Sequence, residues 1–156
     1  MKPWKAYAVG ILSAEAVGAL AGFLTRKGIQ AYGQNAAKPP LTPPALVFPV
    51  VWAVLYALMG IGAARAWLSP DSKYRRRSLN LMAVQLIVNF FWSLIFFNAG
   101  AYGFAALWLV LLWILVLAMI LQMRKVDGCA AWLQVPYLLW LTFAAYLNFG
   151  VWVLNG

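Results

Sequence analysis

Long uncharged stretches, separated by short segments that carry almost all of the charge, are the dominant pattern along the chain. Crossing the hydrocarbon core of a bilayer takes about 20 consecutive apolar residues of helix, and helices are favoured there because lipid cannot hydrogen-bond a free backbone. By this measure the sequence predicts five spanning helices, at about residues 5–25, 45–67, 78–98, 103–123 and 130–153. We therefore expect an all-α integral membrane protein, a five-transmembrane-helix bundle that forms a single domain over residues 1–156.

The third and fourth helices come from one uncharged stretch, residues 78–123, which is about twice as long as a single crossing needs. Two glycines and an asparagine lie near its middle, in the segment from Asn98 to Gly103. Such residues favour turns, so the chain is expected to fold back there. In the fifth helix, Pro136 falls within the first turns and predicts a kink.

The first hydrophobic segment has a rival interpretation, a cleaved signal peptide with Lys2 and Lys5 as its basic start. Glu15 lies in the middle of this segment, and no convincing small-residue cleavage site precedes Arg26 and Lys27. Both observations favour a membrane helix.

Residues 26–44, between the first two helices, form the longest predicted loop and contain Pro39, Pro40, Pro43 and Pro44. Proline fixes φ and disfavours helix, so this segment is expected to be stiff. Two interpretations stay open: a lid at the entrance to the second helix, or simply a stop signal before it.

The composition agrees with lipid as the main solvent, since 65% of the residues are hydrophobic and 10% are charged, against about 25% charged in an average soluble domain. Histidine is absent, which removes the commonest ligand of haem and transition metals and the usual general base near neutral pH. The single cysteine, Cys129, cannot form an internal disulfide and has no metal-binding neighbours. We therefore expect no metal ion, no cofactor and no conventional catalytic constellation.

The formal net charge of +9 falls mainly on one side of the predicted membrane. Five spans place successive connections on alternate sides, so nine of the twelve Lys and Arg residues share the side of the N-terminus, and only Arg26, Lys27 and Lys38 lie on the other. The positive-inside rule then predicts a cytoplasmic N-terminus and an external C-terminus. Because these charges lie between hydrophobic runs, we expect no nucleic-acid binding. No Arg-rich amphipathic presequence is seen, so a bacterial inner (plasma) membrane is the expected location.

Aromatic and amide side chains recur on single helix faces deep inside the predicted spans. They form three sets with helical spacing: Trp52 with Tyr56, Asn89 with Trp92, and Trp140 with Ala144 and Asn148. A buried asparagine is unfavourable in lipid unless it hydrogen-bonds across helices or to a ligand. Aromatic walls with a few polar groups are typical of a pocket for a flat, mostly apolar molecule. For each tryptophan, ordinary core packing is the alternative interpretation.

Glu15 is the only acidic residue inside a predicted span, and an intramembrane carboxyl is a functional candidate. Gly18 and Gly22 lie on the same helix face and form a GxxxG pattern suited to close helix approach. Two interpretations stay open for Glu15: a structural role, protonated and hydrogen-bonded to another helix, or a role in the pocket or in proton coupling.

Four blocks of the chain, in order, resemble the translocator protein family, also called the TspO/MBR or peripheral benzodiazepine receptor family. They are Lys38-Pro39 with Thr42 to Pro44, Phe48 to Tyr56, Asn89 to Trp92 with Ile95 to Phe97, and Val135 to Trp140 with Phe143-Ala144 and Tyr146 to Asn148. The resemblance implies a five-helix bundle, usually a homodimer, whose pocket is closed by the first loop and binds porphyrins, sterol-like lipids and synthetic drugs. Small-residue helix faces are the expected dimer contacts.

The resemblance also implies roles for individual residues. Trp52 and Trp140 match the paired pocket tryptophans that some bacterial relatives use for light-dependent breakdown of protoporphyrin IX, so they are the candidate photochemical residues. The other implied ligand-binding positions are Tyr56, Asn89, Trp92, Ala144 and Asn148, with Pro43 in the loop.

The chain departs from the family pattern at several positions. Leu41 stands where the family's loop has a tryptophan, which weakens the lid. Trp108 replaces an acidic residue often found in the fourth helix, which changes the polar contacts of the pocket. After Asn148 the chain lacks the Lys or Arg of a proposed sterol motif, so cholesterol binding by that route is not expected.

The sequence therefore predicts a receptor-like or sensor-like membrane protein that binds porphyrins and other flat apolar ligands, with membrane lipid as its surroundings. Whether it degrades protoporphyrin IX in light stays open. The alternative is a transporter or exporter of tetrapyrroles or other small apolar molecules, motivated by Glu15 and Pro136. The absence of inverted repeats and the single buried charge argue against transport.

Overall fold

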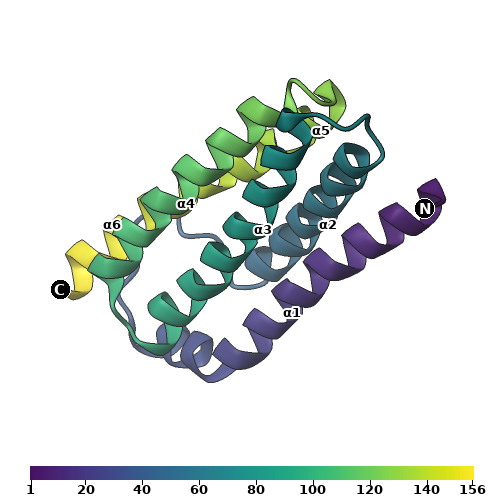
Figure 1. The fold of residues 1–156 in the computed structure, drawn as a ribbon. Coiled ribbons are helices and arrows are strands. Elements are labelled where there is room, and N and C mark those ends of the chain that lie inside the picture. Colours follow the sequence, from purple (N-terminus) through teal and green to yellow (C-terminus); the bar gives the residue numbers. More distant parts are fainter.

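The computed structural model describes residues 1–156 and contains helices alone. The elements are α1 (Pro3–Asn35), α2 (Val47–Trp67), α3 (Lys73–Ser93), η1 (Leu94–Asn98), α4 (Tyr102–Met123), α5 (Gly128–Leu133) and α6 (Val135–Asn155). With η1 continuing α3 and α5 preceding α6, they make five helical spans that are long and apolar enough to cross a membrane. The two termini lie at opposite ends of the bundle (Figure 1). The predicted five-helix bundle is confirmed.

The helices lie side by side along one common direction (Figure 1). Helix α1 packs along α2, α3 packs against α4, and α4 packs against α6, while α5 contacts α2. Large apolar side chains such as Leu107 and Ile114 of α4 are exposed on the outside of the bundle. Lipid is the solvent that makes such an exterior favourable, because an apolar surface gains nothing from water.

Helix α1 is longer than predicted. It continues through Arg26 and Lys27 to Asn35, so the predicted loop over residues 26–44 is wrong in its first part and the connection to α2 begins at Ala36. The two charges mark the end of the apolar run, but the residues after them still form helix. The helix stops ahead of Pro39, and the ammonium group of Lys38 donates hydrogen bonds to the carbonyls of Gly33 (3.1 Å) and Ala36 (3.0 Å). A cation at the last carbonyls of a helix stabilises its end.

The third span begins at Lys73, earlier than the predicted residue 78, because Ser72 caps it by accepting a hydrogen bond from the backbone N–H of Arg75 (3.1 Å). At its other end the chain widens into the π-helical turn η1. The predicted turn then follows, where Gly100 has a positive φ of 62° that favours glycine. The side chain of Asn98 donates to the carbonyl of Leu24 on α1 (3.0 Å) and so holds the turn against the bundle.

The fifth span is broken rather than kinked. Gln134 separates α5 from α6, and its Nε2 donates to the carbonyl of Leu58 on α2 (2.9 Å). Gly62 leaves room for this amide, since a Cβ atom at Gly62 would collide with Nε2 of Gln134. Pro136 lies in the first turn of α6, where its missing N–H leaves no helical bond unmade. The predicted single helix over residues 130–153 with a kink at Pro136 is thus corrected to two helices, Gly128–Leu133 and Val135–Asn155.

Candidate functional site

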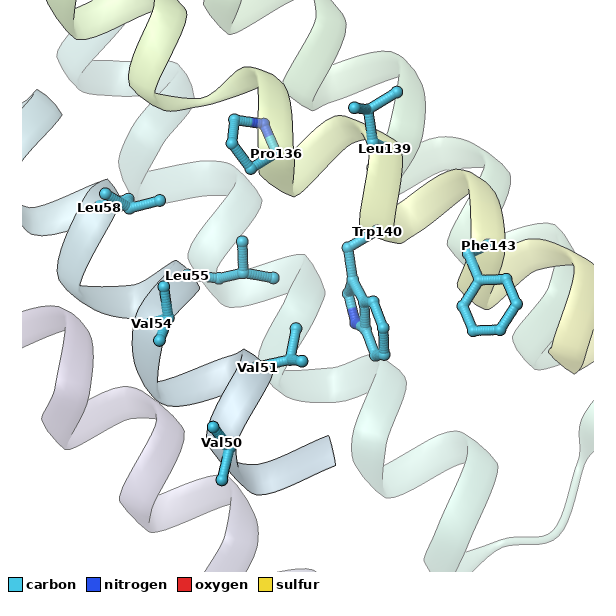
Figure 2. A pocket seen from close by; sticks show the side chains of 9 residues that line it. All are labelled: Val50, Val51, Val54, Leu55, Leu58, Pro136, Leu139, Trp140 and Phe143. Carbon is cyan, nitrogen blue, oxygen red and sulfur yellow. The ribbon is translucent and has the colours of Figure 1, made fainter. Parts of the chain in front are cut away.

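A cavity of about 490 Å³ lies between α2 and α6. Its lining is apolar and comes from these two helices alone: Val50, Val51, Val54, Leu55, Leu58, Pro136, Leu139, Trp140 and Phe143. Figure 2 shows Trp140 extending from α6 toward α2, with Val51 and Leu55 on the opposite side. Val50, Val54 and Leu139 are 57%, 54% and 65% exposed, so the cavity opens toward the outside of the bundle. That opening faces lipid when the helices span a membrane.

Trp140 is the single residue with a polar side chain in this lining. Its ring lies edge-on to Phe48 of α2, with 5.8 Å between ring centroids, and 5.6 Å from Phe143 on its own helix. The indole Nε1 is buried and has no hydrogen-bond partner. A buried donor without a partner loses its hydration without compensation, so Nε1 of Trp140 is an unsatisfied donor on a residue that lines the cavity.

Trp52 belongs to the same group of rings without lining the cavity. It lies one turn after Phe48, and its ring centroid is 5.6 Å from Tyr56 and 6.1 Å from Tyr137 of α6. Tyr137 lies one turn before Trp140, so two successive aromatic contacts, Trp52 to Tyr137 and Phe48 to Trp140, join α2 to α6. The structure therefore brings the two candidate photochemical tryptophans and Tyr56 into one cluster, here named the α2–α6 aromatic cluster: Phe48, Trp52, Tyr56, Tyr137, Trp140 and Phe143.

A buried polar network lies behind this cluster, on α3. The hydroxyl of Tyr137 donates to Oε1 of Gln85 (2.6 Å) and accepts from Nδ2 of Asn89 (2.9 Å). All three side chains are fully buried. Asn89 thus makes the interhelical hydrogen bond expected of it, through an aromatic residue of the cluster. Gln85 escaped the sequence analysis, although it precedes Asn89 by four residues and lies on the same helix face.

Trp92 and Asn148 are hydrogen-bonded to each other, and neither residue lines the cavity. The indole N–H of Trp92 donates to Oδ1 of Asn148 (3.0 Å), whose Nδ2 donates to the carbonyl of Tyr102 (2.9 Å). Ala144, one turn earlier on α6, is buried and does not line the cavity. Trp92, Asn148 and Tyr102 thus form a separate contact among α3, α6 and α4, where the polar groups of Trp92 and Asn148 are satisfied within the chain.

Two further deep tryptophans also have hydrogen-bond partners. Trp108 donates to the carbonyl of Val88 (2.7 Å), and Trp113 donates to Oγ1 of Thr142 (2.9 Å). Trp108, which departs from the family pattern, therefore serves as a contact between α4 and α3. Among the deep tryptophans, Trp52 and Trp140 make no hydrogen bond through their N–H, and that of Trp140 is the buried one.

The loop from Ala36 to Leu46 is attached to the C-terminal part of α6. The hydroxyl of Tyr146 donates to the carbonyl of Pro40 (2.7 Å), and Asn155 exchanges hydrogen bonds with the backbone of Ala37 at 3.0 and 2.8 Å. Pro39 is buried against Gly150. Pro43 is half-buried and does not line the cavity, and Leu41 is exposed with a positive φ of 70°.

Glu15 is half-buried on α1 and makes no hydrogen bond or ion pair in the chain. Gly18, three residues later, lies against the ring of Tyr56, where a Cβ atom would collide with the ring. Gly10 and Gly60 allow a second close approach between α1 and α2, whereas Gly22 faces open space. Gly18 therefore contributes to packing within the chain.

Sequence reasoning missed most of the cavity lining. Val50, Val54 and Leu58 recur every four residues on α2, and Leu139 and Phe143 do so on α6. This spacing is equally typical of a helix surface that faces lipid. The sequence alone therefore does not distinguish a cavity lining from such a surface. Of the lining residues, only Trp140 was predicted as a ligand-binding residue.

The chain was compared with known proteins. A family model described as the TspO/MBR family matches residues 10–153. Protein CrtK of Rhodobacter capsulatus is 40% identical over 80% of this chain and 79% of its own length. The tryptophan-rich protein TspO of Chlorobaculum tepidum is 35% identical over 90% and 89%. The translocator protein of Ovis aries is 36% identical over 96% and 90%.

Proposed function

The chain belongs to the TspO/MBR family of integral membrane proteins, and from this premise we propose that it is a membrane receptor for flat, largely apolar ligands of the porphyrin class. The binding site is the cavity between α2 and α6 (Figure 2). The observation that carries the proposal is the buried, unpartnered N–H of Trp140 beside this cavity. It offers one directed hydrogen bond to a ligand that is otherwise held by apolar contact.

The dimensions and chemistry of the cavity support such a ligand. Its volume of about 490 Å³ lies within the roughly 300–1,000 Å³ of typical ligand sites, which combine apolar walls with few polar groups. A porphyrin presents a flat apolar ring with nitrogen atoms and carboxylates as acceptors. Because the loop from Ala36 to Leu46 is bonded to α6 while Val54 and Leu139 are exposed, the ligand enters from the lipid side.

A titration with protoporphyrin IX in darkness, followed by quenching of tryptophan fluorescence, tests the proposal. Trp140→Phe removes the N–H donor and keeps an aromatic ring, so we expect about tenfold weaker binding, the usual effect of one lost hydrogen bond in a buried site. Trp132→Phe is the matched control, because Trp132 is 74% exposed and does not line the cavity. Equal affinity of the Trp140→Phe variant and the parent would contradict the proposal.

We further propose that the bound porphyrin is broken down in light and air: the excited ring takes one electron from the indole of Trp140 or Trp52, which becomes a radical cation, and the porphyrin radical anion is then oxidised by dissolved oxygen. The support is that Trp140 lines the cavity while Trp52 joins the same aromatic cluster through Tyr137. Illumination of the complex, followed through the porphyrin's Soret absorption band, tests this step at saturating ligand. Trp52→Phe and Trp140→Phe should slow the loss of absorption relative to Trp132→Phe. If Trp52→Phe and Trp140→Phe both lost the Soret absorption at the parent's rate, the tryptophan mechanism would be ruled out.

The membrane context is part of the proposal. The excess of Lys and Arg at the end that holds the N-terminus supports a cytoplasmic N-terminus, an external C-terminus and a bacterial inner membrane as the location. A homodimer is proposed through small-residue faces such as that of Gly22, which is open in one chain. Cysteine labelling from each side of intact cells tests the orientation, and crosslinking in the membrane tests the dimer.

A further inference from the structure

One end of the bundle, which we name the basic end, carries most of the positive charge. It consists of the start of α1, the connection between α2 and α3 with the adjoining turns, and the connection between α4 and α5. In Figure 1 it is the end of the bundle where the N-terminus lies. Nine of the twelve basic residues belong to it: Lys2, Lys5, Arg65, Lys73, Arg75, Arg76, Arg77, Arg124 and Lys125.

Two carboxylates belong to the basic end, and both are already paired within the chain. Asp127 lies 3.1 Å from Nε of Arg65 and accepts a hydrogen bond from the backbone N–H of Ala130. Asp71 accepts two hydrogen bonds from Arg76, at 3.1 and 3.2 Å. Asp71 also lies 3.7 Å from Nη1 of Arg75, so the cations other than Arg65, Arg75 and Arg76 have no acid of the chain to neutralise them.

Two of these cations meet at one aromatic ring. The ammonium groups of Lys73 and Lys125 lie 5.2 and 5.6 Å from the ring centroid of Tyr74. Lys73 begins α3 and Lys125 follows α4, so two neighbouring spans contribute to the cluster. Arg77, one turn after Lys73, and Arg124, next to Lys125, are exposed, and none of the four makes an ion pair. Like charges repel, so an anion among them is favourable.

The position of the cluster indicates which anion it meets. It lies where α3 and α4 leave the apolar part of their spans, the level at which tyrosine side chains mark the membrane interface. Phosphate groups of lipids lie at this level, and basic pockets between spanning helices bind anionic headgroups. We propose that Lys73, Tyr74 and Lys125 form a site for the headgroup of an anionic phospholipid, with Arg77 and Arg124 at its edge.

Lipid titration of the full chain in detergent, followed by native mass spectrometry, tests this site. Phosphatidylglycerol should bind the parent protein about tenfold or more tightly than phosphatidylcholine, because each cation near a membrane surface adds a substantial attraction to anionic lipid. The K73Q/K125Q variant should lose this preference, and K73R/K125R should keep it. The lysines are exposed, and tryptophan fluorescence together with porphyrin binding confirms that each variant folds.

The matched control is R26Q/K27Q, which removes the same charge at the opposite end of the bundle. This control should bind phosphatidylglycerol like the parent. Undiminished binding by K73Q/K125Q, or an equal loss in R26Q/K27Q, would overturn the proposal. Full displacement of the lipid by millimolar glycerol phosphate would also overturn it, since the site would then be one for a free anion.

Discussion

The hydroxyl of Tyr137 donates a 2.6 Å hydrogen bond to Oε1 of Gln85 and so joins α6 to α3 where both side chains are fully buried. The same oxygen accepts a hydrogen bond from Asn89 at 2.9 Å, so the side-chain amides of Gln85 and Asn89 are both hydrogen-bonded to the Tyr137 hydroxyl. The ring of Tyr137 in turn contacts Trp52. A buried polar anchor therefore holds the aromatic wall between α2 and α6 in position.

Removal of that hydroxyl should destabilise the bundle. Tyr137→Phe leaves Gln85 and Asn89 without their partner, and we expect a loss of about 1–2 kcal/mol in the free energy of unfolding. Thermal unfolding in detergent, followed by circular dichroism, measures the change. Tyr74→Phe is the control, because its hydroxyl makes no hydrogen bond in the chain, and the two variants should differ in midpoint temperature.

A methyl group at Gly62 should disturb the break between α5 and α6. In Gly62→Ala the new Cβ atom displaces the amide of Gln134 from the carbonyl of Leu58, and overpacking of this kind costs about 1–3 kcal/mol. Gly33→Ala, in open space on α1, should be neutral or stabilising. A lowered unfolding temperature for Gly62→Ala alone checks the prediction, and equal temperatures would contradict it.

A larger side chain at the mouth of the cavity should obstruct the ligand. Val54→Phe fills the opening between α2 and α6, so we expect at least about tenfold weaker binding of protoporphyrin IX. Ile114→Phe enlarges an equally exposed apolar residue on α4, away from the cavity, and should bind like the parent. The quenching titration in darkness compares them, and equal affinities would place the ligand elsewhere.

The ion pair of Asp127 should make stability depend on pH. Burial raises the pKa of this carboxyl, but the backbone N–H of Ala130 and the guanidinium of Arg65 outweigh burial and leave the pKa below its usual value. The pair therefore stabilises the fold above the unfolded value of about 3.9, and this stability is lost as the pH falls through the lower folded pKa.

Asp127→Asn tests that dependence, because asparagine caps a helix about as well as aspartate but carries no charge. The variant should unfold at a lower temperature than the parent at pH 7, and the difference should shrink as the pH falls below the unfolded value of about 3.9. Asp71→Asn, which breaks an exposed pair, should change little over the same range. A difference that stays constant as the pH falls would assign the effect to something other than the charge.

The attachment of the first loop to α6 should be sensitive to Gly150. A Cβ atom there would lie 2.6 Å from the ring of Pro39, so Gly150→Ala should push the loop away from the helix. Faster hydrogen–deuterium exchange at residues 36–46 is the expected result. Gly33→Ala, with open space around it, should exchange like the parent, and equal protection in both variants would show that Pro39 does not hold the loop.

The spans could be predicted from sequence because lipid imposes one simple rule on length and charge, whereas helix ends obey other rules. Arg26 and Lys27 mark the limit of the apolar run, yet α1 continues for two more turns, because charge does not end a helix and the first proline after them is Pro39. The break at Gln134 also escaped prediction. It depends on room left by Gly62 on another helix, a relation that no local pattern contains.

The candidate site was also predicted only in part, because helical spacing groups residues within one helix. Helical spacing groups Trp52 with Tyr56 and marks Asn89 as a residue that needs a partner, and the structure places all three near Tyr137. Spacing does not tell which helices face each other. For that reason the pairing of Trp92 with Asn148 and the cavity between α2 and α6 could be found only in three dimensions.

The length of α1 has a mechanical consequence. Thirty-three residues of helix extend about 50 Å, well beyond the roughly 30 Å of hydrocarbon that they must cross. Helices adapt to bilayer thickness by tilting, and Lys38 fastens the following loop to the end of this one. A helix longer than the hydrocarbon is thick must tilt in the membrane or extend beyond it, and the start of the loop at Ala36 takes the position of its end.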